Sequence, residues 1–141
     1  IVASSASVFG LAEVRRGLVA IGGGCFRLPR RLPWPIAMEM ILTGQPMSAQ
    51  QMQQHGYVNS IVAPGRVLDE ALRLAGLIAG NGPLAVKASK EIAWTAVGEN
   101  WSDEDGWRRQ MEIVAPVLAS EDLREGLQAF AQKRPAVWKG R

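Results

Sequence analysis

The 141-residue chain has the composition of an ordinary globular domain, with 48% hydrophobic and 21% charged residues. These fractions exclude intrinsic disorder and collagen-like scaffolds, and the longest apolar run, Leu18–Phe26, is far shorter than the ~20 residues that a membrane-spanning helix needs. Sixteen basic and 13 acidic residues give a net charge of +3, which permits contact with phosphate-bearing ligands without requiring it. The length predicts one compact domain and is too short to predict two.

The single cysteine and the first residues indicate the context of the chain. Cys25 cannot form an internal disulfide, which favours a reducing compartment, and we expect the cytoplasm. The chain starts at Ile1-Val2-Ala3, with neither an initiator methionine nor a signal-peptide pattern. We therefore expect it to be the second part of a longer protein, so that a site shared with the first part is incomplete here.

The first half of the chain is predicted to alternate short strands and helices, because glycine, proline and serine interrupt it every few residues. The predicted elements are a strand end at Ile1–Ala3, one or two helical turns within 11–18, a tight turn at Gly22-Gly23-Gly24, a helix over 35–43 with Gly44 as its C′ residue, a helix from a Ser48–Gln51 capping box to about His55, and a short strand within 57–63.

The second half is predicted to be helical. Leucine, isoleucine and alanine recur at helical spacing over 67–79, and Asn81-Gly82-Pro83 ends that helix. Three more helices are predicted over 84–97, 101–118 and 121–133. Ser102 and Ser120, each followed by acidic residues, are typical first residues of the last two.

Glu13 is the first candidate acid or base. It lies in an apolar stretch beside Gly10, and apolar surroundings favour the protonated form that a proton-transferring carboxylate needs. The alternative interpretation is a surface glutamate that pairs with Arg15 or Arg16.

The remaining motifs favour structural roles. The glycine triplet matches neither the Walker phosphate loop nor the dinucleotide fingerprint, and His55 has no second metal ligand at a suitable spacing. Cys25 is expected to be buried and inert, because no base neighbours it. Five arginines, at 15, 16, 27, 30 and 31, form a basic cluster that we interpret as a solvated face or a phosphate contact, not as a nucleic-acid groove. The tryptophans at 94, 101 and 107 suit packing within the chain or a subunit interface.

Short motifs follow one another along the whole chain in an order that is more specific than any one of them. They are Phe9-Gly10-Leu11-Ala12-Glu13-Val14, Arg16-Gly17-Leu18-Val19, Gly23-Gly24, Arg27-Leu28-Pro29-Arg30, Ala37-Met38-Glu39-Met40, Leu42-Thr43-Gly44, Ser48-Ala49, Gly56-Tyr57-Val58-Asn59, Pro83-Leu84-Ala85-Val86-Lys87, Glu125-Gly126-Leu127-Gln128-Ala129-Phe130 and Lys133-Arg134. In this order they resemble the enoyl-CoA hydratase/isomerase (crotonase) family.

The resemblance implies an α/β fold, a crotonase-like spiral of strand-strand-helix turns of which this chain is the C-terminal part, mostly helical with one or two short strands. Residues 1–66 would end the spiral core and carry the catalytic-glutamate turn, and residues 67–141 would form a helical oligomerisation region. It implies a homotrimer or hexamer, an acyl-CoA substrate and no cofactor, because coenzyme A is part of the substrate. Metal, nucleic acid and membrane are not expected as partners.

The resemblance also implies roles for single residues. Glu13 stands where the second catalytic glutamate of the hydratases is expected, donating a proton to the α-carbon during water addition. Both donors of the oxyanion hole would lie before Ile1, together with the first glutamate. Leu18, Ala20 and Gly23 would contact the substrate. Two further substrate-binding residues, Phe130 and Lys133, match a segment that approaches the CoA of a neighbouring subunit, or else serve core packing and helix-surface charge.

Two positions depart from the family pattern. Ala12 and Ala20 stand where proline is usual, which leaves the turn around Glu13 less rigid but removes no functional group.

The predicted activity is the hydration of trans-2-enoyl-CoA thioesters, as in fatty-acid β-oxidation. An enoyl-CoA isomerase or another family activity, such as dehalogenation or thioester hydrolysis, is the alternative among enzymes, and a second glutamate upstream of Ile1 would distinguish the hydratase. A non-catalytic oligomerisation and CoA-binding fragment is the alternative from another class, for which residues 1–141 alone would show no hydration.

Overall fold

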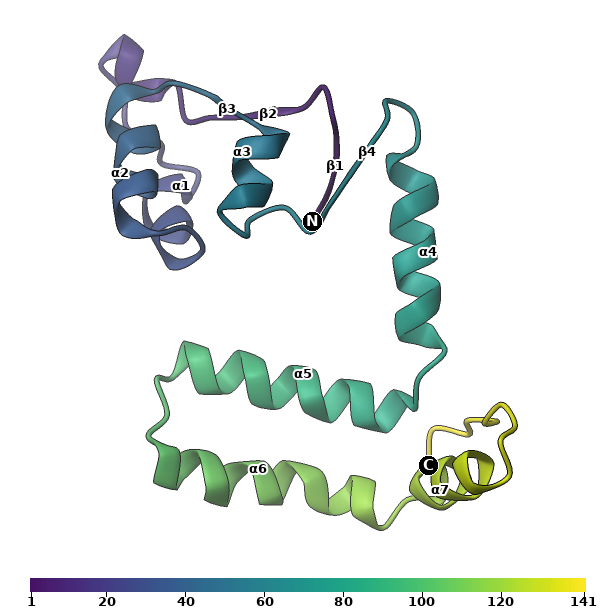
Figure 1. Ribbon diagram of the computed structural model, residues 1–141. Coiled ribbons are helices and arrows are strands. Elements are labelled where there is room, and N and C mark those ends of the chain that lie inside the picture. Colours follow the sequence, from purple (N-terminus) through teal and green to yellow (C-terminus); the bar gives the residue numbers. More distant parts are fainter. The chain divides into compact units, whose positions relative to one another are not determined.

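The computed structural model describes residues 1–141, and the chain forms two compact units, Ile1–Arg73 and Leu74–Arg141 (Figure 1). The prediction of one compact domain is therefore wrong. The division falls inside α4 (Val67–Ala79), a helix that buries none of its residues. The buried hydrophobic cluster lies entirely in the first unit, so no core spans the division.

Two small sheets organise the first unit. β1 (Val2–Ser4) pairs in parallel with β4 (Ser60–Val62), and β2 (Val8–Phe9) pairs antiparallel with β3 (Met47–Ser48). The strand end at the start and the strand within 57–63 are as predicted, whereas β2 and β3 bring the number to four and were not predicted. A strand of two residues is too short to show the alternation of apolar and polar residues from which strands are predicted.

Three helices of the first unit, at 13–16, 34–43 and 49–54, lie where helices were predicted, and two short ones at 24–27 and 28–30 were not predicted. They are the 3₁₀ helix η1 (Glu13–Arg16), α1 (Gly24–Arg27), the 3₁₀ helix η2 (Leu28–Arg30), α2 (Trp34–Thr43) and α3 (Ala49–Gln54). Gly44 ends α2 in the left-handed conformation, and the Ser48–Gln51 capping box forms at the start of α3. The glycine triplet differs from its prediction, because its last residue already begins α1.

The core of the first unit determines where α2 lies. Met40 on α2 and Met52 on α3 are fully buried, and three alanines allow the elements around them to approach closely. These alanines are Ala3, Ala37 and Ala49. The inner face of α2 is buried in this way, which fixes the position of the helix. Gly44, at the end of α2, therefore lies at the turn that holds Glu13.

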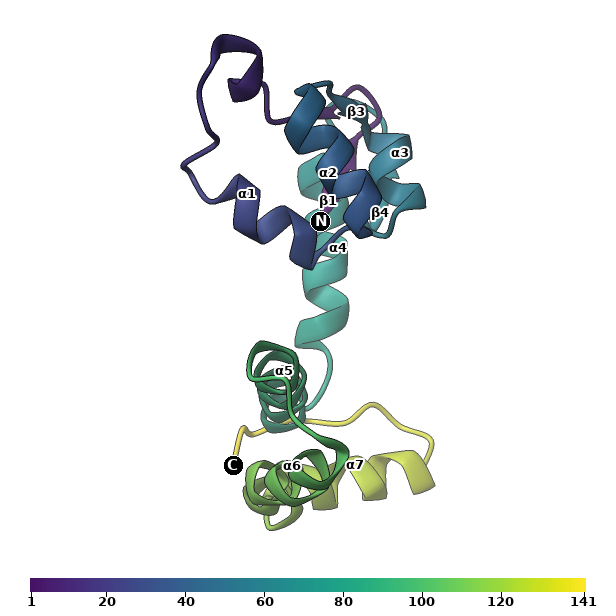
Figure 2. The same cartoon turned by 90° about the vertical axis from the view of Figure 1, so that its left-hand side faces the viewer.

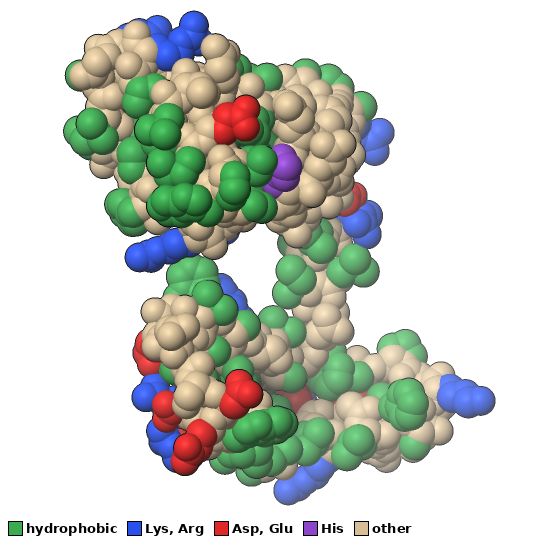
Figure 3. Space-filling model, turned by 60° about the vertical axis from the view of Figure 1, so that its left-hand side comes forward, with side chains coloured by type: hydrophobic (Ala, Val, Ile, Leu, Met, Phe, Trp, Pro, Cys, Tyr) green, Lys and Arg blue, Asp and Glu red, His purple; other side chains and the backbone are tan.

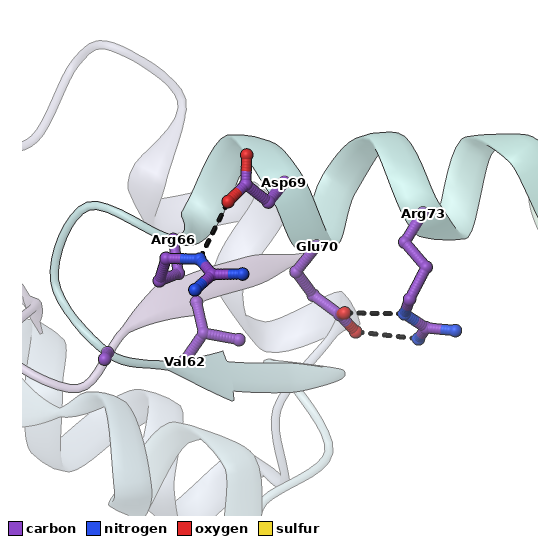
Figure 4. A pocket seen from close by; sticks show the side chains of 6 residues that line it. Val62, Arg66, Asp69, Glu70 and Arg73 are labelled. Carbon is purple, nitrogen blue, oxygen red and sulfur yellow. Dashed lines mark hydrogen bonds and ion pairs between the residues drawn. The ribbon is translucent and has the colours of Figure 1, made fainter.

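A hollow of about 380 Å³ lies between β4 and the start of α4 (Figure 4). Glu70 accepts hydrogen bonds from Arg73 at 2.7 and 2.8 Å and from the Ser60 hydroxyl at 3.0 Å, and these bonds lower its pKa to about 2. Arg66 pairs with Asp69 at 2.7 Å. Since every charged group that lines the hollow has an opposite charge beside it, we assign it a structural role, the attachment of α4 to β4.

The second unit consists of the end of α4, three further helices and a returning tail. α5 (Pro83–Gly98) and α6 (Asp103–Leu118) pack side by side, and α7 (Glu121–Ala131) follows (Figure 2). The hydroxyls of Ser102 and Ser120 accept hydrogen bonds from the backbone at the starts of α6 and α7, as predicted. α7 ends two residues before the predicted boundary. No helix in the chain has the length and apolar character needed to span a membrane.

Trp94 on α5 and Trp107 on α6 are not covered within the second unit. Trp94 is 69% exposed and Trp107 is 72% exposed, and only Trp101 is half-buried, with the Arg109 guanidinium 5.1 Å from its ring centre. Figure 3 shows hydrophobic side chains on the surface of these helices (Figure 3). Packing within the second unit therefore does not account for Trp94 and Trp107.

Candidate active site

Glu13 is the first residue of η1, and two close approaches to glycine fix this turn. A Cβ atom at Gly24 would lie 2.7 Å from Leu11 Cδ2, and a Cβ atom at Gly44 would lie 2.7 Å from Arg15 Cγ. Both distances are shorter than real carbon contacts, so a Cβ atom at either glycine would force the Leu11 or the Arg15 side chain to shift. The residues on both sides of Glu13 are thus held against the start of α1 and the end of α2.

The Glu13 side chain is half-buried and unpaired. It forms no ion pair with Arg15 or Arg16 and accepts no hydrogen bond, so the alternative of a paired surface glutamate is wrong. Its backbone oxygen accepts a hydrogen bond from Leu18 N–H at 3.1 Å, and Gly17 ends η1 in the left-handed conformation. The Glu13 carboxylate therefore has no ion-pair or hydrogen-bond partner among the side chains of this chain.

The other predicted substrate contacts of the first unit lie on the segment between η1 and α1, drawn in Figure 2 as the loop that leads into α1. Leu18 is 61% exposed, Ala20 is buried, and Gly23 is buried in the left-handed conformation. The structure also exposes Val19 and Ile21, which the sequence prediction did not single out. Their signal was the unbroken apolar run at 18–21, but such a run predicts burial in a complete domain, so the sequence did not indicate their exposure.

Phe130 and Lys133 lie at the end of α7 in the second unit. Phe130 is 86% exposed, so core packing does not explain it. Lys133 N–H donates to the Phe130 carbonyl at 3.1 Å and Arg134 N–H donates to the Ala129 carbonyl at 3.0 Å, the bonds of a helix end at which glycine is the usual residue. Lys133 occupies that place with φ of 53°, which costs an L-residue about 1–2 kcal/mol. Lys133 forms no ion pair in the chain, so no ion pair offsets the free-energy cost of its left-handed backbone conformation.

The remaining candidates are structural. Cys25 is half-buried, not buried as predicted, because it lies on the short and partly open α1. His55 ends α3, and no group of His, Cys, Asp or Glu side chains could hold a metal ion. Arg27 and Arg30 lie 5.5 and 6.0 Å from the Phe26 ring centre, so part of the basic cluster stacks on an aromatic ring.

Comparison with known proteins places these features in a family. The model of the family described as enoyl-CoA hydratase/isomerase matches residues 1–141. The chain belongs to this family. Carnitinyl-CoA dehydratases from Proteus mirabilis and from a Salmonella paratyphi B strain are 42% and 41% identical to it over 145 aligned residues, covering 100% of this chain and 55% of theirs. The chain thus spans about half the length of the curated relatives that it matches.

Solved structures of the family confirm the fold class. The crystal structure of an enoyl-CoA hydratase from Mycobacterium tuberculosis H37Rv matches with a TM-score of 0.93 and 47% identity, and one from Mycobacterium marinum matches with 0.92 and 48%. Each match covers 100% of this chain and 55% of the other. The fold is therefore that of the C-terminal part of a crotonase-like enzyme, mostly helical with short strands.

Proposed function

We propose that the protein containing this chain is an enoyl-CoA hydratase in which Glu13 donates the proton to the α-carbon of a trans-2-enoyl-CoA thioester. The observation that supports this most strongly is the half-buried, unpartnered Glu13 carboxylate, held by Gly24 and Gly44 in a chain of this family. Acyl-CoA is the substrate and coenzyme A is part of it, so no separate cofactor is proposed.

The proposed reaction adds water across the double bond. The water oxygen bonds to the β-carbon as the water gives one proton to the first glutamate, which we assign to the part of the enzyme outside this chain. The electron pair of the double bond moves toward the thioester oxygen as an enolate. The enolate then takes up at the α-carbon the proton that Glu13 supplies, which leaves Glu13 as a carboxylate. Stabilising the enolate oxygen by two backbone N–H groups is a large term in such reactions. We assign those donors to the part of the enzyme that is not in this chain.

The dehydratases among the relatives favour the reverse of this reaction, the removal of water. Carnitinyl-CoA dehydratases are 41–42% identical to the chain, and a dehydratase removes the water that a hydratase adds. In that direction Glu13 would take the α-proton instead of donating it. An isomerase remains the other alternative, since it needs a single carboxylate to move a proton between two carbons.

A substrate panel tests the proposal with the full-length protein. We expect crotonyl-CoA to lose its enoyl absorbance as it is hydrated, and 3-enoyl-CoA to remain unchanged. Conversion of 3-enoyl-CoA without hydration of crotonyl-CoA would establish the isomerase. Residues 1–141 alone should hydrate neither substrate, and hydration by them at an ordinary family rate would show that the second half is sufficient.

A substitution at Lys133 should separate ligand binding from stability. We propose that the Lys133 ammonium contacts the phosphates of CoA. Lys133→Gly relieves the left-handed strain and should raise the free energy of unfolding by about 1 kcal/mol, while the Kd for CoA rises about tenfold. Thermal unfolding and titration calorimetry measure the two effects. A stabilised variant that binds CoA as tightly as the wild type would remove Lys133 from the site.

We further propose that the helices from residue 84 onward contact other subunits in a homotrimer or hexamer. Trp94 and Trp107 are the support, because large exposed aromatic side chains are typical of subunit contacts. The melting temperature should rise with protomer concentration, since association stabilises the folded state. A monomer mass by light scattering, together with a melting temperature independent of concentration, would contradict the oligomer.

A further inference from the structure

The Arg134 guanidinium ties together the chain on both sides of Lys133. Its Nε donates to Gln132 Oε1 at 2.7 Å, on the helix side of Lys133. Its Nη1 donates to the Pro135 carbonyl at 3.0 Å, on the tail side. Both terminal nitrogens donate to the carboxylate of Glu125, at 2.6 and 2.9 Å. Four hydrogen bonds from one planar group thus surround the residue that holds the left-handed conformation.

Glu125 is the acceptor on which this arrangement depends. It lies on α7, and its side chain is only 20% exposed. Besides the two-pronged pair with Arg134, its Oε1 accepts a hydrogen bond from Val137 N–H at 2.8 Å, so it also holds the returning tail. The Arg134 hydrogen bonds, and after them the Val137 bond, lower the pKa of Glu125 to about 2. The carboxylate is therefore charged at any pH at which the protein would work.

We propose that Glu125 is a positioning residue for CoA: through Arg134 it holds Lys133 in the conformation that fixes where the ammonium meets the CoA phosphates. This rests on the proposed function, in which Lys133 makes that contact. Paired Arg–carboxylate forks restrict orientation as well as supplying energy, and a lysine side chain has many conformations to lose when it binds. We call the Glu125–Arg134 pair a clamp. Because this clamp fixes the backbone of Lys133 before CoA binds, it reduces the conformational entropy that the lysine loses on binding.

Glu125→Gln tests the inference in the full-length protein, because glutamine keeps the size of the side chain but loses its charge and one acceptor oxygen. We expect the Kd for CoA and the KM for crotonyl-CoA to rise about tenfold, with kcat changed less than about twofold. The KM for crotonyl-pantetheine, which lacks the nucleotide, should stay at its wild-type value. Glu121→Gln is the matched control: Glu121 pairs with Lys139 and Arg141 in the same tail, away from Lys133, and its loss should leave the Kd unchanged.

A double variant distinguishes positioning from plain stabilisation. In a Lys133→Met background, Glu125→Gln should raise the Kd no further, because residues that act through one another are not additive. A full tenfold increase in that background, or a lower melting temperature with an unchanged Kd in Glu125→Gln alone, would overturn the positioning role. If Lys133→Met itself leaves the Kd unchanged, the proposed CoA contact fails, and the inference fails with it.

A second substitution covers the case in which Glu125→Gln does not fold. Arg134→Lys keeps the positive charge but cannot bond Gln132, Glu125 and Pro135 from one planar group. We expect the same tenfold increase in the Kd for CoA, and an unchanged Kd in a folded Arg134→Lys protein would count against the clamp.

Discussion

Glu13→Gln should reduce the turnover of crotonyl-CoA by about 10²–10⁴-fold, the usual effect of removing a positioned proton donor. The glutamine amide has nearly the same size as the carboxyl group but cannot transfer the proton. Because Glu13 forms no ion pair or side-chain hydrogen bond in the chain, its replacement should leave both the fold and the Kd for acyl-CoA near their wild-type values. Steady-state kinetics, calorimetry and thermal unfolding of the full-length protein measure the three quantities.

Glu39→Gln is the matched control for this substitution. Glu39 is an exposed glutamate on α2 in the same compact unit, and its side chain also forms no ion pair. The same loss of one charge should therefore leave turnover unchanged. Hydration by Glu13→Gln at the rate of Glu39→Gln would remove Glu13 from the mechanism.

Gly44→Ala should reduce both stability and turnover, although Gly44 has no chemistry of its own. Its φ of 65° costs alanine about 1–2 kcal/mol, and the new Cβ at 2.7 Å from Arg15 Cγ adds an overpacking cost of about 1–3 kcal/mol. If the collision moves η1 by about 1 Å, turnover falls about 10²-fold, because catalytic groups tolerate little misplacement. Chemical denaturation and steady-state kinetics test the two effects.

Gly56→Ala separates the backbone strain from the displacement of Glu13. Gly56 has φ of 75°, close to that of Gly44, but a Cβ there would meet nothing within 4 Å. This variant should lose about 1–2 kcal/mol of stability and keep its turnover. Equal turnover in the two glycine variants would show that the contact with Arg15 does not position Glu13.

The parts of the fold that local chemistry determines were predictable from the sequence. Ser48 with Gln51, Gly44, Ser102 and Ser120 mark helix ends through bonds to residues three or four positions away, and the structure forms them all. The short pairing of β2 with β3 was not predictable, because it joins residues about forty positions apart and leaves no periodic pattern.

The candidate site was predictable only where one residue carries the signal. Glu13 could be singled out from its apolar surroundings and its motif, while the glycines that hold its turn, Gly24 and Gly44, show their reason only through contacts with Leu11 and Arg15. The Glu125–Arg134 clamp spans a chain reversal, and no helical spacing brings residues nine positions apart into contact. The division of the chain inside α4 likewise depends on where the core lies, which composition does not determine.

The most direct test of Glu13 as the proton-transferring group is exchange of the α-hydrogens of butyryl-CoA with solvent deuterium, followed by NMR. Butyryl-CoA has no double bond and no hydroxyl group, so exchange at its α-carbon requires proton transfer and an enolate but no water addition. We predict that the full-length protein catalyses this exchange and that Glu13→Gln slows it at least about 10²-fold, while Glu39→Gln does not. Exchange by Glu13→Gln at the wild-type rate would contradict the assignment of proton transfer to Glu13.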